Sequence, residues 1–236
     1  ENLFRLTCLP WRQTSRVLPQ ADLRQIYFDI LRLNAEKLQQ NLQYMLGGRH
    51  PFKRLTHDRL ACGEHQLPDP VHYALAADFH VDSLTSIIHG DLNGYNVLVD
   101  QRHDTWLIDF ANTRRGPLAH DYTCFETSLR LDVDASLLLS DALQWAQALF
   151  AGNVKAPVIP SSVSVTPELA RTHAAVCAVR RLAWEEHAGS TQRAYLCGLF
   201  FNALKLMTVM DLNARLRDRA LLSAALIARE LQTISS

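Results

Sequence analysis

The sequence lacks the features that mark several large classes of protein. Its five cysteines are odd in number, widely spaced and without a C-x-x-C pair, which argues against a disulfide framework or a zinc knuckle. No apolar run approaches the roughly 20 residues that cross a bilayer, and no basic-then-apolar signal opens the chain. We therefore expect a cytoplasmic protein with no membrane partner.

An excess of charge of one sign is also missing. Lysine and arginine together number 24, and so do aspartate and glutamate. Proteins that bind nucleic acid or acidic membranes through their overall field carry a basic excess, so we expect no nucleic-acid partner. The 236 residues, 48% of them hydrophobic, are enough for one sizeable core.

Turn residues and apolar periodicity divide the first part of the chain. Residues 1–20 carry two prolines among scattered polar residues and predict an irregular lead-in or linker. Apolar residues then recur every three to five positions over residues 21–45, which predicts one long helix that Gly47 and Gly48 end. Residues 50–70 show no clear period, and we expect a loop or short helical pieces there.

The second half of the chain combines a small β element with helices. β-Branched runs at residues 86–88, 97–99 and 105–108 predict strands, the last two as an antiparallel hairpin. Helices are expected over residues 120–131, 136–151, 167–187, 191–210 and 214–233, with Ser136 and Thr166 as N-caps. The predicted fold class is therefore α+β, mainly α.

Polar residues around the predicted hairpin suggest a binding site. Residues 87–100 read I-I-H-G-D-L-N-G-Y-N-V-L-V-D, and residues 106–111 read W-L-I-D-F-A. If Asp100 faces Thr105, Asn96 stands opposite Asp109 at the open end of the ribbon. An amide oxygen and a carboxylate there suit a hard cation such as magnesium, which keeps places for water and phosphate oxygens.

Asp91 lies in the loop that enters the hairpin, five residues before Asn96. A carboxylate at this place can orient a substrate hydroxyl and accept its proton as it attacks phosphorus. Gly90 permits a tight turn, and His89 is expected to brace the loop by hydrogen bonding. The loop and the hairpin together predict a phosphoryl-transfer site.

The run H-G-D-L-N-x-x-N-V-L-V-D followed by L-I-D-F resembles the catalytic loop and metal-binding strand of the aminoglycoside phosphotransferase and choline kinase group, within the protein-kinase-like superfamily. The resemblance implies that Asp91 is the catalytic base and that Asn96 and Asp109 bind Mg²⁺. It also implies that Asp121 supports the catalytic loop from behind, as His89 does from within it.

The same resemblance implies a fold and a reaction. Residues 21–236 would form the larger, C-terminal lobe of such an enzyme, with a hairpin that carries the catalytic loop and a helical bundle. The enzyme would transfer a phosphoryl group from ATP to a hydroxyl of a small molecule. Gly90 and Asn93 stand where protein kinases usually have arginine and lysine, which favours the small-molecule kinases and makes Asn93 a candidate substrate contact.

An active kinase of this group also needs a smaller lobe with a glycine-rich loop and a strand lysine. The sequence has neither G-x-G-x-x-G nor G-x-x-x-x-G-K. Because the chain begins with Glu1 rather than methionine, we expect an upstream or separate domain to complete the nucleotide site. The alternative is a catalytically inactive, kinase-like regulatory or scaffold domain of a multidomain bacterial signalling protein.

Three other side chains have two interpretations each, and Arg180 has one. Arg114 and Arg115 follow the metal strand and either contact a phosphate or are simply solvated, as loop arginines more often are. Tyr95 either stacks on a ligand or packs under the loop, and packing is favoured. Arg180 is expected on a solvated helix face.

Overall fold

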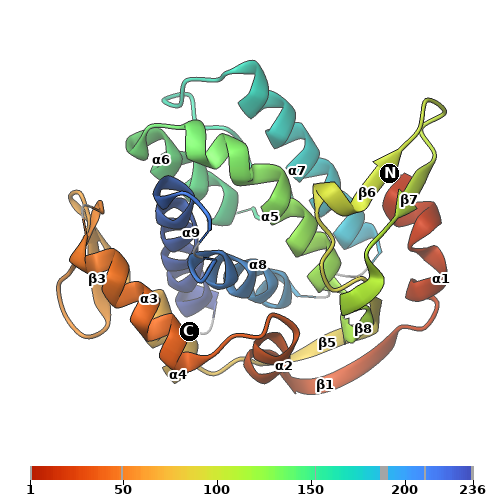
Figure 1. Ribbon diagram of the computed structural model, residues 1–236, viewed down its shortest axis with the longest axis horizontal. Coiled ribbons are helices and arrows are strands. Elements are labelled where there is room, and N and C mark those ends of the chain that lie inside the picture. Colours follow the sequence, from red (N-terminus) through yellow and green to blue (C-terminus); the bar gives the residue numbers. More distant parts are fainter. Residues whose placement is uncertain (1, 49, 152, 187–190, 210, 235–236) are drawn as a thin grey trace.

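The computed structural model describes residues 2–48, 50–151, 153–186, 191–209 and 211–234. Within these residues the fold is α+β and mainly helical, with small antiparallel sheets. Figure 1 shows the helical bundle between a sheet formed by residues 52–68, on the left, and a ribbon formed by residues 97–107, on the upper right. No helix in the described ranges is both long and apolar enough to cross a membrane.

The chain opens with ordered structure, so the irregular lead-in predicted for residues 1–20 was wrong. This segment contains the π-helical turn η1 (Leu3–Thr7), α1 (Leu9–Arg12) and β1 (Arg16–Asp22). Phe4 stacks on Tyr122, with ring centroids 4.1 Å apart. Arg12 forms an ion pair with Glu186. These contacts reach residues far along the chain, and local sequence patterns do not reveal them.

Two helices, α2 (Leu23–Ile30) and α3 (Ala35–Gly47), replace the single helix predicted over residues 21–45. Arg32 lies between them with a left-handed φ of 52°, through which an α-helix cannot continue. Asn34 then caps α3, because its side-chain oxygen accepts a hydrogen bond from the Lys37 amide at 3.1 Å. The apolar period continues across the break and therefore concealed it.

Residues 50–70, expected as a loop or helical pieces, form an antiparallel sheet instead. Its strands are β2 (Phe52–Arg54), β3 (Arg59–Cys62) and β4 (His65–Pro68). Phe52, Leu60 and Leu67 are buried and join the core. The strands are too short to show a clear alternation of apolar and polar residues, which explains why the sequence did not reveal them.

The strand β5 (His80–Ile88) lies between β1 and β8 (Arg114–Pro117) in a second antiparallel sheet. It is preceded by α4 (Pro70–Ala76), whose N-cap Asp69 accepts hydrogen bonds from two backbone amides. The end of β5 leads directly into the polar residues that the sequence singled out. This sheet therefore fixes where that polar segment begins.

β6 (Val97–Val99) and β7 (Thr105–Leu107) form the predicted hairpin, but the predicted register was wrong by one residue. Val99, not Asp100, faces Thr105. The loop closes instead between Asp100 and Asp104, whose N and O atoms are 3.1 Å apart. His103 adopts a left-handed φ of 63°, as the last residue of a three-residue hairpin loop commonly does.

The bundle consists of the helices α5 (Ala119–Ser136), α6 (Leu139–Phe150), α7 (Pro167–Glu185), α8 (Gln192–Met207) and α9 (Ala214–Ile234). Thr166 caps α7 as predicted, because its hydroxyl accepts a hydrogen bond from the Leu169 amide at 3.1 Å. Ser136 ends α5 and does not cap α6. The predicted helix ends at His187 and Met210 lie outside the described residues.

Arg180 is fully buried inside the bundle, so its predicted place on a solvated face was wrong. Its Nε and Nη2 donate hydrogen bonds to the Glu126 carboxylate at 2.8 and 2.6 Å. The Tyr195 hydroxyl donates to the same carboxylate at 2.8 Å. A buried cation requires a partner of this kind, and the spacing of charges along α7 could not show that Glu126 of α5 provides it.

Candidate active site

Residues 89–96, here called the polar loop, connect β5 to β6, and α5 holds this loop from behind. Asp121 is buried in the first turn of α5. Its two carboxylate oxygens accept hydrogen bonds from the backbone amides of His89 and Gly90 at 2.8 and 3.0 Å. Burial raises the pKa of this carboxyl group, while His120 and the two amides oppose the rise. Asp121 thus fixes the start of the polar loop.

Two buried histidines connect the polar loop to its neighbours. His89 Nε2 donates a hydrogen bond to the carbonyl oxygen of Ile108 at 2.9 Å, and His120 Nε2 donates to that of Gly90 at 3.2 Å. Burial lowers the pKa of His120. Neither Nδ1 atom has a hydrogen-bond partner in the described part of the chain, so each ring acts through its Nε2–H group. Both histidines therefore position backbone.

Glycine is required at position 90. Its backbone is left-handed, with φ of 82°, and a Cβ atom there would lie 2.3 Å from the carbonyl oxygen of Asn112. Such a separation is far below any van der Waals contact. The polar loop and the short helix η3 (Phe110–Asn112) are therefore in close contact, and this contact brings the residues after β7 to the polar loop.

Amide side chains order the middle of the polar loop. Asn96 is buried, and its Nδ2 donates a hydrogen bond to the backbone carbonyl of Asp91 at 2.8 Å. Asn93 Nδ2 lies 3.3 Å from Asp91 Oδ1. Among the described residues, no donor forms a hydrogen bond with the Asn96 side-chain oxygen or with Asp91 Oδ2.

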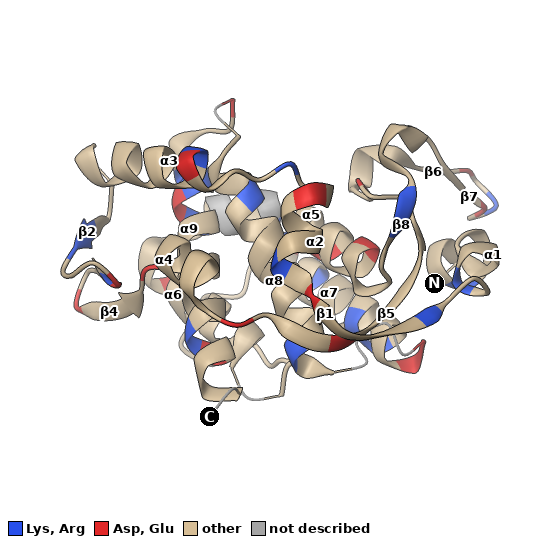
Figure 2. Cartoon of the chain, turned by 90° about the horizontal axis from the view of Figure 1, so that it is seen from below, with Lys and Arg blue, Asp and Glu red and all other residues tan. Residues whose placement is uncertain are grey.

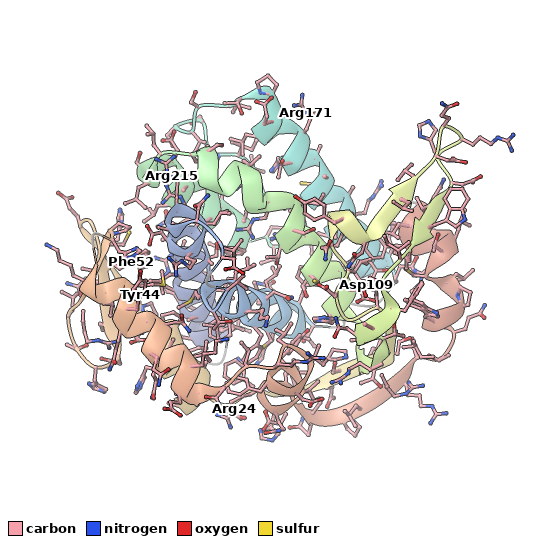
Figure 3. The ribbon with its side chains drawn as sticks, viewed as in Figure 1. Arg24, Tyr44, Phe52, Asp109, Arg171 and Arg215 are labelled. Carbon is pink, nitrogen blue, oxygen red and sulfur yellow. The ribbon has the colours of Figure 1, made fainter. Side chains whose placement is uncertain are left out.

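Asp109 lies at the open end of the ribbon, near the polar loop (Figure 3). The Ile108 amide donates a hydrogen bond to the Asn96 carbonyl at 3.1 Å, so Asn96 stands opposite Ile108 and Asp109 follows directly. Asp109 is exposed and left-handed, with φ of 62° and ψ of 68°. A non-glycine residue in this conformation is uncommon, and such residues concentrate at functional sites.

The residues at this end of the ribbon fit a magnesium ion better than a transition metal. No group of three or more His, Cys, Asp or Glu side chains suited to a metal occurs in the described ranges. Asn96 and Asp109 offer one amide oxygen and one carboxylate. Magnesium commonly takes one or two such protein ligands and fills its remaining positions with water and phosphate oxygens.

A cavity of about 740 Å³ opens beside Asp91. Its walls come from the polar loop, α5, α8 and the junction between α2 and α3. Tyr95 is 90% exposed and lines this cavity, so the favoured interpretation, that it packs under the loop, was wrong. Asn93 also lines the cavity, and the substrate contact predicted for it stays a prediction.

Two cavity-lining cations, Arg32 and Lys205, were not identified from the sequence. Lys205 is the single charged residue in the apolar stretch 203–207, and that isolation was a usable signal. Arg32 gave no signal, because the residues around it fit the pattern of one continuous helix. Cys124, which also lines the cavity, is an un-ionised thiol because burial raises its pKa.

Arg114 and Arg115 lie in β8 and point their guanidinium groups at other partners. Arg114 Nη1 forms an ion pair with Asp29 at 2.6 Å. Arg115 Nη1 donates a hydrogen bond to the carbonyl oxygen of Thr14 at 3.1 Å. Neither residue lines the cavity beside Asp91. The phosphate contact considered for these two arginines stays a prediction.

A family model described as ternary complex associated domain 9 (TCAD9) matches residues 31–208. The chain belongs to this family. The match includes the polar loop, the β6–β7 hairpin and both cavity-lining cations of the TCAD9 domain. No curated protein and no solved structure gives a significant match to the chain.

Proposed function

We propose that this TCAD9 domain is an ATP- and magnesium-dependent phosphotransferase that acts on a hydroxyl group of a small molecule. The observation that carries the proposal is the position of Asp91. Its carboxylate lines a 740 Å³ cavity and belongs to the same polar loop as the buried Asn96. The resemblance of the polar loop and hairpin to small-molecule kinases supports the same conclusion.

Asp91 would act on the acceptor hydroxyl. Asn93 donates a hydrogen bond to one of its carboxylate oxygens, and the other accepts none from the described residues. The acceptor oxygen forms a bond to the γ-phosphorus, the bond from that phosphorus to the β,γ-bridging oxygen breaks, and ADP leaves with the electron pair. The acceptor proton passes to Asp91. Such a reaction depends mainly on positioning and on stabilising charge.

Asn96 and Asp109 would hold magnesium, which neutralises the phosphate charges that develop during transfer. The protein fixes the Asn96 side chain and the backbone beside Asp109 before any ligand binds. The Asn96 amide is held by the Asp91 carbonyl, and the residue before Asp109 is held by His89. Little reorganisation is then needed when the metal and nucleotide arrive.

The β6–β7 ribbon offers an apolar surface for the nucleotide base. Leu98 and Trp106 face each other across the ribbon, are 50% and 51% exposed, and lie on the same face as Asn96 because side chains alternate along a strand. Ile108 extends this face and is 40% exposed. A purine stacked there would place its phosphates toward Asn96 and Asp109.

A second function is a kinase-like regulatory or scaffold domain without turnover. Two observations favour it. No glycine-rich phosphate loop occurs in the sequence, and the family description, ternary complex associated, suggests a role within a complex. Unlike the first function, this one does not require Asp91 to contact a ligand.

Calorimetric titration with ATP, with and without magnesium, tests the proposal. It should be run on this chain and, where the natural protein is longer, on that protein too. We expect magnesium-dependent binding that Asp109→Asn abolishes. Asp104→Asn is the matched control, because Asp104 is an exposed carboxylate at the other end of the same ribbon. Absence of magnesium-dependent binding in every version of the protein would contradict the enzyme and favour the regulatory domain.

A further inference from the structure

The cavity beside Asp91 carries more positive than negative charge. Its charged lining residues are Arg32, Lys205 and Asp91. No ion pair or side-chain hydrogen bond joins Arg32 or Lys205 to another residue of the described chain, unlike Arg114, which pairs with Asp29. Two cations that form no ion pair within the described residues therefore face the space next to the proposed base.

The backbone places Arg32 at this position. Its left-handed φ of 52° lies in the short junction between α2 and α3, a conformation that an arginine adopts only at some cost. The residues on either side, Leu31 and Leu33, are buried and anchor the junction in the core. The backbone of Arg32 is thus anchored beside the cavity that its exposed side chain lines.

Lys205 approaches the same cavity from the last turn of α8. Burial lowers the pKa of its ammonium group, and the like charges of Lys37 and Arg32 lower it further, while Asp91 opposes them. Lys37 lies in α3, and Figure 2 marks basic residues in both α3 and α8. Arg32 and Lys205 both line the cavity and repel each other, and an anion bound between them would relieve this repulsion.

The remaining walls of the cavity combine apolar and uncharged polar side chains. Ile30, Leu129, Leu206 and Val209 line it together with the neutral Cys124 thiol, and the polar side chains are those of Asn93, Tyr95, Asn112, Thr127, Ser128 and Asn202. A ligand that fills this space therefore meets apolar groups, neutral hydrogen-bonding groups, two cations and the Asp91 carboxylate. A cationic acceptor would be repelled by both Arg32 and Lys205.

We propose that this cavity binds an anionic hydroxy compound, whose carboxylate or phosphate-ester group contacts Arg32 and Lys205 and whose hydroxyl group contacts Asp91. This inference rests on the proposed function, since it treats the cavity as the acceptor site. Arginine and lysine both bind oxyanions through charge-assisted hydrogen bonds. The acceptor class would then be opposite in charge to the aminoglycosides and choline.

Binding in the absence of ATP and magnesium tests this inference. The probes are glycerol 3-phosphate, glycerate, glycerol and choline, which share a hydroxyl group and differ in charge. We expect one of the two anions to bind at least about tenfold more tightly than glycerol or choline, as one charge-assisted hydrogen bond would allow. Comparison of the two anions distinguishes a phosphate-ester site from a carboxylate site.

Three variants locate the bound anion. Lys205→Met removes the charge and keeps an unbranched side chain, and Arg32→Asn suits the left-handed backbone. Each should weaken anion binding about tenfold. Lys53→Met is the matched control, because Lys53 is exposed in β2 and does not line the cavity; it should leave binding unchanged.

Several outcomes overturn the inference. They are equal or tighter binding of choline, no anion binding up to about 10 mM, or anion binding that Lys53→Met weakens as much as Lys205→Met. Failure of the proposed function looks different: the anions bind through Arg32 and Lys205, yet ATP shows no magnesium-dependent binding. Magnesium-dependent ATP binding without anion binding would reject the acceptor class alone.

Discussion

The two sides of α5 use buried carboxylates in different ways. Asp121, which faces the polar loop, accepts hydrogen bonds from two backbone amides. Glu126, which faces the bundle, binds the buried Arg180 and accepts a hydrogen bond from Tyr195. The first carboxylate fixes the position of a loop, and the second neutralises a buried cation. One helix thereby sets the geometry of the candidate site at one end and holds the core together further along.

The largest effect is expected at the bundle side of α5. Glu126→Gln leaves the Arg180 guanidinium buried without a counter-charge, and we expect a loss of about 3–5 kcal/mol in the free energy of unfolding. Urea denaturation measures it. Glu168→Gln is the control, because Glu168 forms an exposed ion pair with Arg171, and it should change stability by well under about 1 kcal/mol. Equal losses of stability in the two variants would show that the buried ion pair contributes no more than the exposed one.

The next effect concerns the contact between the polar loop and η3. Gly90→Ala forces a Cβ atom against the Asn112 carbonyl and strains a left-handed residue, so we expect a loss of about 1–3 kcal/mol together with loss of ATP binding. Gly94→Ala is the matched control in the same loop, because nothing lies within 4 Å of its added Cβ. If both variants bind ATP equally, the contact does not position the site.

A smaller effect on stability is expected at the loop side of α5. Asp121→Asn keeps one oxygen acceptor but loses the second, at a cost of about 1–2 kcal/mol. The cost is moderate because burial already disfavours the ionised form of this carboxyl. Hydrogen exchange at the amides of His89 and Gly90 should become faster, while exchange in the bundle stays unchanged. Uniform acceleration across the chain would show that Asp121 serves global stability instead.

The smallest effect is a dependence on pH. Burial lowers the pKa of His120 from 6.5, so the stability this neutral ring contributes is present above pH 6.5 and is lost as the pH falls through its lower folded value. The slope is at most about 1.4 kcal/mol per pH unit. Asp121, whose pKa is raised, acts in the opposite sense: its contribution is present below its unfolded value of 3.8 and is lost as the pH rises through its higher folded value.

A glutamine at position 120 separates the effect of His120 from that of other groups. His120→Gln keeps a donor for the Gly90 carbonyl and removes the titration. As the pH is lowered from about 7 to about 5.5, the free energy of unfolding should fall less steeply for this variant than for the original chain. Parallel slopes would show that His120 does not exclude a proton in the folded state.

The two strands of the hairpin could be predicted from local features of the sequence, but their register could not. Turn residues between two β-branched runs located β6 and β7, but the left-handed His103 closed the loop one residue earlier than expected. Similarly, the apolar period predicted one continuous helix, but the left-handed backbone of Arg32 divides this segment into α2 and α3. Backbone choices of this kind at non-glycine residues depend on tertiary packing, and a single sequence does not display them.

In the candidate site, too, some residues could be predicted from the sequence and others could not. Asp91, Asn96 and Asp109 could be predicted as site residues because they lie close together in the sequence, within a recognisable motif. Arg32 and Lys205 are separated by more than half the length of the chain, and only the fold brings them to the same cavity. The burial of Arg180 likewise depends on Glu126, which belongs to another helix. Contacts between distant segments are what the sequence left open.

Phosphoryl transfer followed by phosphorus NMR tests the central claim most directly. The protein is incubated with ATP, magnesium and the hydroxylated probes, beside an Asp91→Asn variant. We predict ADP together with a new phosphate-ester signal for the original protein, and neither for Asp91→Asn, whose side chain cannot accept the acceptor proton. Equal turnover by Asp91→Asn, or no transfer to any probe by a protein that binds magnesium and ATP, would contradict the account.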